Sequence, residues 1–172
     1  MDSPIVTPAF CHLMARYNQW QNRGQIDAAS TLSVEALVAD RGAFFRSILG
    51  TLNHLLWGDV VWMSRFDDWE KPTIGIPQST EFTNDFIAFR GARLAADRAI
   101  VDWSGRVTAN DLSGELRWFS GALGQDVAKP MAICVAHFFN HQTHHRGQIH
   151  AMLTAAGAVP EATDLFILPE QS

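Results

Sequence analysis

The sequence predicts an all-α protein built as a four-helix bundle. Four stretches carry apolar residues at helical spacing, and prolines and glycines gather in the connections between them. A length of 172 residues, with 47% hydrophobic and 18% charged residues, is typical of one globular unit. We therefore expect residues 1–172 to form a single helical domain.

The first helix is expected from Pro8 to Gln25, where apolar residues recur at helical spacing. Thr7 can cap its N-terminus, with Pro8 at the first helical position. Gly24 is the predicted end of this helix, because glycine is the commonest residue just past a helix C-terminus.

The second long helix is expected over residues 40–66, after a minor helical turn between Ser33 and Asp40. This tract contains no proline and is apolar nearly all round, which is typical of a helix buried on most of its surface. It carries His54, the only histidine between residues 13 and 136.

Residues 67–80 contain two prolines and mixed charges, so we expect a loop there. Thr80 or Thr83 can cap the next helix, which is predicted from residue 81 to about residue 103. Glycines then interrupt residues 104–130, and this segment is predicted to form a short hairpin or an irregular lid.

The last helix is expected to start at Pro130, to run to about Ala156 and to end at Gly157. The tail after it is extended and partly apolar. Residues 165–168 are therefore expected to pack back on the bundle.

The last helix carries five of the seven histidines: His137, His141, His144, His145 and His150. His141 and His145 lie on its core-facing stripe, about 40° apart around the helix axis and one turn apart along it. Both rings can point to one place, as in other helical HxxxH metal sites. Buried imidazoles need a partner, and a divalent metal is the simplest one, although a hydrogen-bonded structural role is the alternative.

His54 is a candidate for a third ligand. It lies in the most apolar helix, where an unsatisfied polar group costs a few kcal/mol. The second and fourth helices of an antiparallel bundle can face each other, so His54 can meet His141 and His145. Three imidazoles from two facing helices would leave at least one coordination position open.

Bulk properties exclude several classes of protein. The formal net charge of −5 argues against general nucleic-acid binding, which favours a basic face. Cys11 and Cys134 are too few for a disulfide framework and fit a reducing cytoplasm. No secretory signal and no apolar run long enough to span a membrane is present in the sequence, so we expect a cytoplasmic protein.

Three sequence segments resemble the DinB family: YNQW from Tyr17, NHLLWGD from Asn53, and FNHQTHHRGQIHAML from Phe139. They follow the expected order over nearly the whole chain, and NHxxHHRGQ is a hallmark of that family. The resemblance implies a four-helix bundle with up-down-down-up connectivity, usually dimeric. It also implies a divalent metal held by His54, His141 and His145. Six Trp and eleven Phe residues, more than one small bundle needs, also suggest a homodimer.

The sequence leaves the activity open. Related branches of the family look like enzymes that use low-molecular-weight thiols, so one hypothesis is a metal-dependent thiol S-transferase or hydrolase. Three neutral ligands leave zinc or nickel, the metals expected here, with their full charge, which can activate water or a thiol. The alternative is a metal-dependent small-ligand binding or stress-response protein without turnover. Cys134 lies on the core stripe and is a poor candidate nucleophile.

Four further residues near the predicted site have open roles. His144 is offset from the stripe and is expected near the ligands or in solvent. Asp59 is expected to tie helices together. Arg146 is expected to form a surface pair, with binding of an anionic substrate group as the alternative. Gln148 belongs to the same motif, and the sequence does not fix its role.

Overall fold

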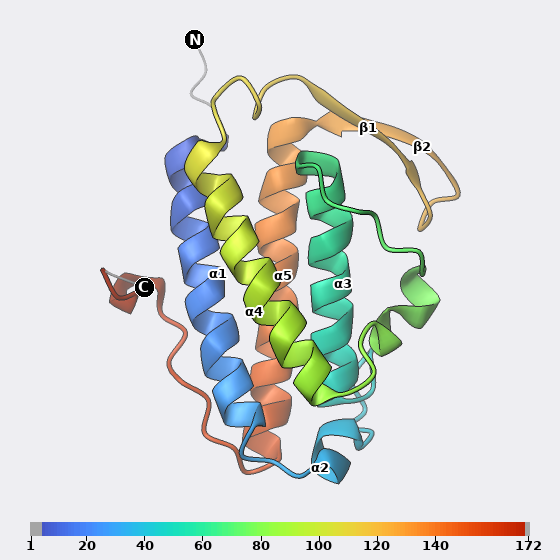
Figure 1. Ribbon diagram of the computed structural model, residues 1–172, viewed down its shortest axis with the longest axis vertical. Coiled ribbons are helices and arrows are strands. Elements are labelled where there is room, and N and C mark those ends of the chain that lie inside the picture. Colours follow the sequence, from blue (N-terminus) through green and yellow to red (C-terminus); the bar gives the residue numbers. More distant parts are fainter. Residues whose placement is uncertain (1–4, 171–172) are drawn as a thin grey trace.

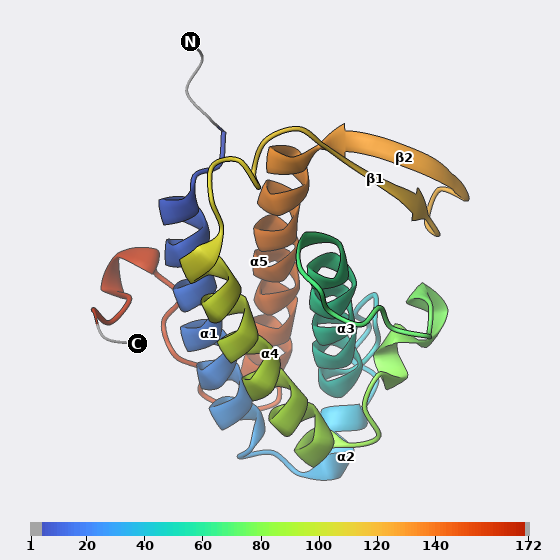
Figure 2. The same cartoon turned by 45° about the horizontal axis from the view of Figure 1, so that its top comes forward.

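The computed structural model describes residues 5–170 and is mainly helical (Figure 1). Its long helices are α1 (Pro8–Ala29), α3 (Ile48–Phe66), α4 (Phe86–Arg106) and α5 (Met131–Ala155). They lie side by side as a bundle in both views (Figures 1 and 2). Helices α1 and α3 each pack against both α4 and α5. The prediction of a helical protein is thus confirmed, with a small two-stranded sheet added to it.

Helix α1 begins as predicted, because the Thr7 hydroxyl accepts a hydrogen bond from the Phe10 amide and Pro8 opens the helix. Its predicted end at Gly24 is wrong, since the helix continues to Ala29. Ile26 and Ala29 are buried in the bundle core, and this burial outweighs the cost of about 1 kcal/mol for a glycine inside a helix.

Helix α3 starts eight residues later than predicted. Ser47 caps it, and its hydroxyl accepts a hydrogen bond from the Gly50 amide. Residues 40–47 instead form a tight loop in which Gly42 and Arg46 both have positive φ angles, of 71° and 66°. An ion pair of 2.8 Å between Arg46 and Asp40 closes this loop. The short helix α2 (Val34–Val38), capped by Ser33, precedes it as expected.

The connection after α3 contains the 3-10 helix η1 (Ile76–Glu81), where the sequence predicted only a loop. Helix α4 starts at Phe86 because Asp85, and not Thr80 or Thr83, caps it through the Ala88 amide. The Thr83 hydroxyl instead donates a hydrogen bond of 2.7 Å to Oδ1 of Asn53 on α3. This bond anchors the connection to the helix that carries His54.

The predicted hairpin is present as strands β1 (Glu115–Ser120) and β2 (Gln125–Pro130), which pair antiparallel with Trp118 opposite Val127. It leads directly into α5 and extends away from the bundle at the end where α3 finishes (Figure 2). Helix α5 is followed by Gly157 at a φ of 87°, as the sequence suggested.

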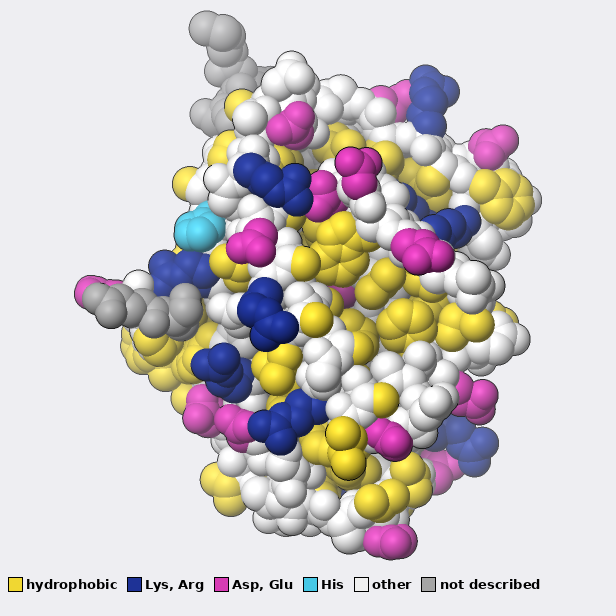
Figure 3. All heavy atoms as spheres, viewed as in Figure 1, with side chains coloured by type: hydrophobic (Ala, Val, Ile, Leu, Met, Phe, Trp, Pro, Cys, Tyr) yellow, Lys and Arg dark blue, Asp and Glu magenta, His cyan; other side chains and the backbone are white. Residues whose placement is uncertain are grey.

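The C-terminal segment crosses back over α1, but not through its apolar side chains. The Tyr17 hydroxyl donates to the carbonyl oxygen of Thr163 at 2.6 Å, and Gln21 donates to that of Ala162. Phe166, in the 3-10 helix η2 (Leu165–Ile167), is 87% exposed, so the expected apolar packing of residues 165–168 is wrong for Phe166. Leu165 and Ile167 are 40% and 45% exposed, and Leu168 is half-buried, so these three pack in part. Figure 3 shows hydrophobic side chains at the surface beside this segment.

Two apolar clusters fill the bundle. One contains Leu56, Phe89 and Leu153, and the other contains Met63, Trp103 and Phe138. Buried polar side chains from all four long helices also lie inside the bundle: Asn18, Asn22, His54, Asp59, Arg93, Asp97, Gln142, His145 and Arg146. Among the described helices, none is long and apolar enough to cross a lipid bilayer.

Candidate metal centre

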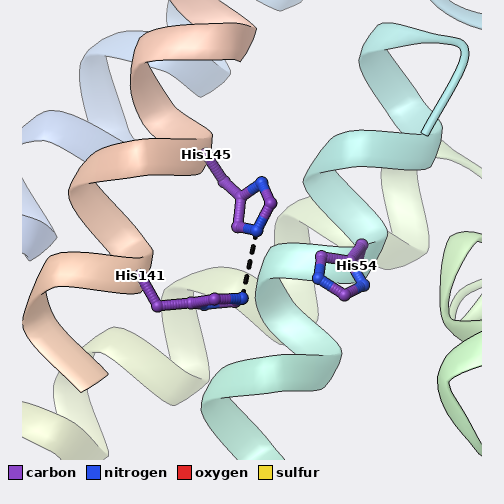
Figure 4. A group of neighbouring side chains, drawn as sticks. All are labelled: His54, His141 and His145. Atoms are coloured by element: carbon purple, nitrogen blue, oxygen red, sulfur yellow. Dashed lines mark hydrogen bonds between the residues drawn. The ribbon is translucent and has the colours of Figure 1, made fainter. Parts of the chain in front are cut away.

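Helices α3 and α5 bring His54, His141 and His145 together (Figure 4). Each ring offers one nitrogen, and these nitrogens all lie within 4.8 Å of one another. The Nε2 atoms of His141 and His145 are 3.0 Å apart. Small rotations of the rings would place all three nitrogens around one ion, at the roughly 2 Å that zinc takes from imidazole.

Ser79, in η1, fixes the ring of His54. The Ser79 hydroxyl donates its hydrogen to the carbonyl oxygen of Ile76 at 2.7 Å. It therefore accepts from Nδ1 of His54, at 2.8 Å. With the proton on Nδ1, the lone pair of His54 is on Nε2, available to a cation.

Gln148 does the same for His145 from one turn further along α5. Its Oε1 atom can only accept, so the contact of 2.8 Å places the proton of His145 on Nδ1. The lone pair is then on Nε2, the atom that faces Nε2 of His141. Carboxyl, carbonyl or amide partners of this kind usually orient metal-binding histidines.

Gly58 makes room for His141. A Cβ atom at position 58 would lie 3.0 Å from Cε1 of His141, closer than side chains normally pack. Nδ1 of His141 is buried and has no hydrogen-bond partner among the described residues. The ring is therefore held by its position against α3, not by a polar partner.

The three rings are uncharged at neutral pH. Burial, with a smaller contribution from His145, lowers the pKa of His54 from 6.5 to about 4. Burial and the neighbouring histidines lower the pKa of His141 to about 3. Burial also lowers the pKa of His145. Neutral imidazoles are the form that binds divalent metals, so the donor set fits such an ion.

Phe45 closes one side of the cluster. Its ring stacks on His54 with a centroid distance of 3.7 Å and an interplanar angle of 20°, and it lies 5.5 Å from the ring of His145. The neighbouring Arg46 adopts its left-handed conformation in the loop that presents Phe45. This apolar cover restricts water on that side.

The other side of the cluster opens into a cavity of ≈ 370 Å³. It lies between α3, the α3–α4 connection, the hairpin and α5. His54 and His141 form one wall, and Trp57, Trp62 and Trp118 line much of the rest. A small molecule that enters this space can reach the histidine cluster.

The remaining candidates take different places. His137 is exposed and lines the same cavity, whereas His144 is exposed and lies outside it. Cys134 is buried, and burial raises the pKa of its thiol, which argues against a nucleophilic role. Asp59 ties α3 to α4 through an ion pair of 2.5 Å with Arg93, as expected.

Arg146 is not at the surface, so the expectation of a surface pair is wrong. Only 4% of this residue is exposed. Its guanidinium lies over the ring of Tyr17, 5.3 Å from the centroid, and donates to the hydroxyl of Thr143. Asp59 and Asp97 on other helices offset its buried charge, and the sequence pattern alone does not place them beside Arg146.

Sequence reasoning did not identify Ser79, Phe45 or Gly58 as parts of the site. Ser79 and Phe45 come from connections whose path the sequence does not fix. Gly58 carried a usable signal, because a glycine inside a long apolar helix lowers helix propensity and needs a reason. Its position one turn after His54 points to close packing against the partner helix.

Comparison with known proteins agrees with this arrangement. The chain matches the DinB family over residues 6–171. The chain belongs to the DinB family. No curated protein matches it significantly. Family membership therefore accounts for the helical fold and is consistent with a three-histidine metal site, and the reaction has to be inferred from the site itself.

Proposed function

We propose that His54, His141 and His145 bind one divalent metal ion, zinc or nickel, and that this DinB protein is a metal-dependent enzyme. The enzyme activates a low-molecular-weight thiol or water for attack on a small electrophile. One observation carries the proposal: three neutral imidazoles converge at the wall of a cavity that a small molecule can enter.

The ligand set explains why a bound metal would be reactive. A dication held by three neutral ligands keeps its full charge and lowers the pKa of bound water or of a thiol. Ser79 and Gln148 keep the lone pairs of His54 and His145 on the nitrogens that face the site. Phe45 limits water on one side, and the cavity admits the reactants on the other.

The nucleophile has to come from outside the protein. Cys134 is buried with a raised thiol pKa, and Cys11 is buried with its pKa raised to about 11. Neither cysteine lines the cavity. A thiol substrate or water is therefore the group that a metal at this site would activate.

A metal-dependent binding or stress-response protein without turnover is the second candidate. It is favoured by the composition of the cavity, whose lining residues include no Asp or Glu. Apart from the three clustered histidines, His137 is the only lining residue of the type that commonly acts as a general base near pH 7. Turnover with an added thiol separates the two functions.

Metal content tests the ligand set. Protein purified without a histidine tag should hold one metal per chain, measured by inductively coupled plasma mass spectrometry. Replacing His54, His141 or His145 with Ala should lower occupancy sharply, and His144→Ala, an exposed position on α5, should leave it unchanged. Full occupancy and affinity in His54→Ala would remove that residue from the site.

Activity is tested with a panel of thiols and a generic electrophile, and in parallel with a panel of esters. Both run on metal-loaded and metal-stripped protein at neutral pH. Metal-dependent consumption of one thiol or ester supports the enzyme. Absence of turnover across both panels favours the binding protein, and turnover that survives complete metal removal contradicts metal-dependent catalysis.

We further infer a cytoplasmic homodimer with the up-down-down-up connectivity typical of the family. In Figure 1 the chain runs down α1 and α5 and up α3 and α4, which supports that connectivity. The buried free thiols of Cys11 and Cys134 suit a reducing compartment. Phe44 and Phe166, both more than 80% exposed, suit an interface between two copies. Light scattering that gives a concentration-independent mass near 19.1 kDa would contradict the dimer.

A further inference from the structure

The cavity beside the histidine cluster has cationic side chains in its lining. Arg65 and Lys71 line it, together with the uncharged histidines, and no carboxylate does. This local charge contrasts with the formal net charge of −5 for the whole chain. A cationic cavity in an acidic protein concentrates anions at that place and not elsewhere on the surface.

Several arginines of this protein pair with carboxylates, but among the described residues Arg65 does not. Arg93 pairs with Asp59 and Asp97, Arg106 with Asp67, and Arg117 with Glu115. Within residues 5–170, no ion pair involves Arg65. Its guanidinium instead lies over two tryptophan rings, 4.5 Å from the centroid of Trp62 and 5.1 Å from that of Trp118.

This cation is partly desolvated. Arg65 is half-buried at the end of α3, and burial lowers the pKa of its guanidinium. The two tryptophan rings confine the guanidinium and offer it no carboxylate or carbonyl acceptor. Because arginine presents paired donors that match a carboxylate, such a confined cation without an ion-pair partner in the described structure suits an acid.

A continuous aromatic wall joins Arg65 to the histidine cluster. The ring of His137 lies 5.8 Å from that of His141 and 5.1 Å from that of Trp62, over which the guanidinium of Arg65 lies. Arg65 follows His54 by eleven positions on α3, or roughly 16 Å of helix rise, and its side chain reaches back towards His54. The two ends of the cavity are thus separated by a distance on the order of 10 Å.

We propose that the cavity binds an elongated, carboxylate-bearing thiol lengthwise, with its acid group at Arg65 and its sulfur at the histidine cluster. The tryptophans contact the apolar middle of the molecule. The cavity volume of ≈ 370 Å³ suits a molecule of this size. This inference rests on the proposed metal site, because the metal is what would hold the sulfur.

Calorimetric titration of zinc-loaded protein with two pairs of compounds tests the inference. 6-Mercaptohexanoate carries an acid at a distance from its sulfur, and 6-mercaptohexanol lacks the charge. The acid should bind about tenfold more tightly than the alcohol, since a charge-assisted hydrogen bond contributes at least this much. 3-Mercaptopropionate, which is too short to reach both ends, should show little advantage over 3-mercaptopropanol.

Variants identify the cationic end. Arg65→Gln should abolish the preference for the six-carbon acid and leave binding of the alcohol unchanged. Arg90→Gln, an exposed arginine on α4 outside the cavity lining, should behave as the unchanged protein does. If Arg65→Gln does not fold, Arg65→Met replaces it, because methionine keeps an aliphatic side chain between the tryptophans. The comparison of acid with alcohol on the unchanged protein tests the preference without any variant.

The outcomes separate this inference from the proposed function. Equal affinities for the six-carbon acid and alcohol, with one zinc bound, would overturn the inference and leave the metal site intact. A preference that persists in Arg65→Gln would overturn it as well. If the protein holds no zinc, the proposed function fails, and binding of hexanoate compared with hexanol then tests the acid site at Arg65 alone. A preference for hexanoate that is lost in Arg65→Gln supports the acid site. Equal binding of the two compounds overturns it.

Discussion

Two buried polar clusters lie in this bundle and differ in how charge is arranged within them. In the first, Arg93 of α4 pairs with Asp59 of α3 at 2.5 Å and with Asp97 of its own helix at 2.8 Å, and Asn22 of α1 donates to Asp97. In the second, the nitrogens of three uncharged histidines face one another across the gap between α3 and α5.

The difference lies in where each cluster finds its counter-charge. With Arg146, which interacts electrostatically with Asp59 and Asp97, the first contains two arginines and two aspartates, so its charges balance within the protein. The histidine cluster is uncharged, and its ring nitrogens face a shared point. One cluster therefore balances its charges with its own residues, and the other is suited to receive a cation from outside.

The largest expected effect comes from removing the central cation of the ion-pair cluster. Arg93→Met leaves the carboxylates of Asp59 and Asp97 buried without their shared partner. The free energy of unfolding should fall by about 3–5 kcal/mol, the typical cost of removing one member of a buried ion pair. Urea denaturation measures this loss.

Arg90→Met is the matched control, because Arg90 is exposed on the same helix. Its effect should stay within about 0.5 kcal/mol. A loss below about 1 kcal/mol in Arg93→Met would mean that the ion pairs do not stabilise the bundle. Metal content per folded chain should be the same in both variants if the two clusters act independently.

The sequence predicted the histidine cluster better than the ion-pair cluster, for a physical reason. His141 and His145 share a helix, so their spacing alone places them on one face. Arg93 and Arg146 also lie on helices, but a long charged side chain normally reaches solvent. The spacing of Arg93 and Asp97 is that of an ion pair within one helix, but it does not show that the pair is buried. The contact of Arg93 with Asp59 of α3 is a tertiary feature that spacing within one helix does not contain.

The two ends of the first helix show the same contrast between local and tertiary causes. The first helix starts where Thr7 and Pro8 predicted, because capping is local. It does not end at Gly24, since burial of the next turn outweighs glycine's low propensity. Ser79 and Phe45 reach the site through connections, and the sequence did not predict the course of either connection. The ligands themselves could be predicted from the sequence, and most of the groups that orient them could not.

The pH dependence of metal-free protein should sharpen the contrast. The folded-state pKa values of His54 and His141, about 4 and about 3, lie below the unfolded value near 6.5. Between these values the unfolded chain binds more protons, so stability is lost as the pH falls from 6.5. Allowing for the partial exposure of the two rings, the free energy of unfolding should fall by about 2 kcal/mol between pH 6.5 and 5.

The ion-pair cluster acts in the opposite direction over the same window. Burial raises the pKa of Asp97 to about 6, so the folded state takes up a proton there as the pH falls. The histidine contribution is therefore measured by comparing two proteins, both kept metal-free with a chelator. His141→Leu should lose less free energy of unfolding between pH 6.5 and 5 than the unchanged protein. Equal losses would mean that His141 is not buried in its neutral form.

The smallest effect is expected from Gln148, which orients His145 without lying among the converging nitrogens. Gln148→Ala removes the acceptor that keeps the proton of His145 on Nδ1, so the ring can turn or change tautomer. Zinc affinity, measured by competition with a chelating dye, should fall about tenfold, as for other residues that orient metal ligands. Gln148→Glu keeps an acceptor at the same place and should retain most of the affinity. An unchanged affinity in Gln148→Ala would show that packing against Phe45 is enough to hold the His145 ring.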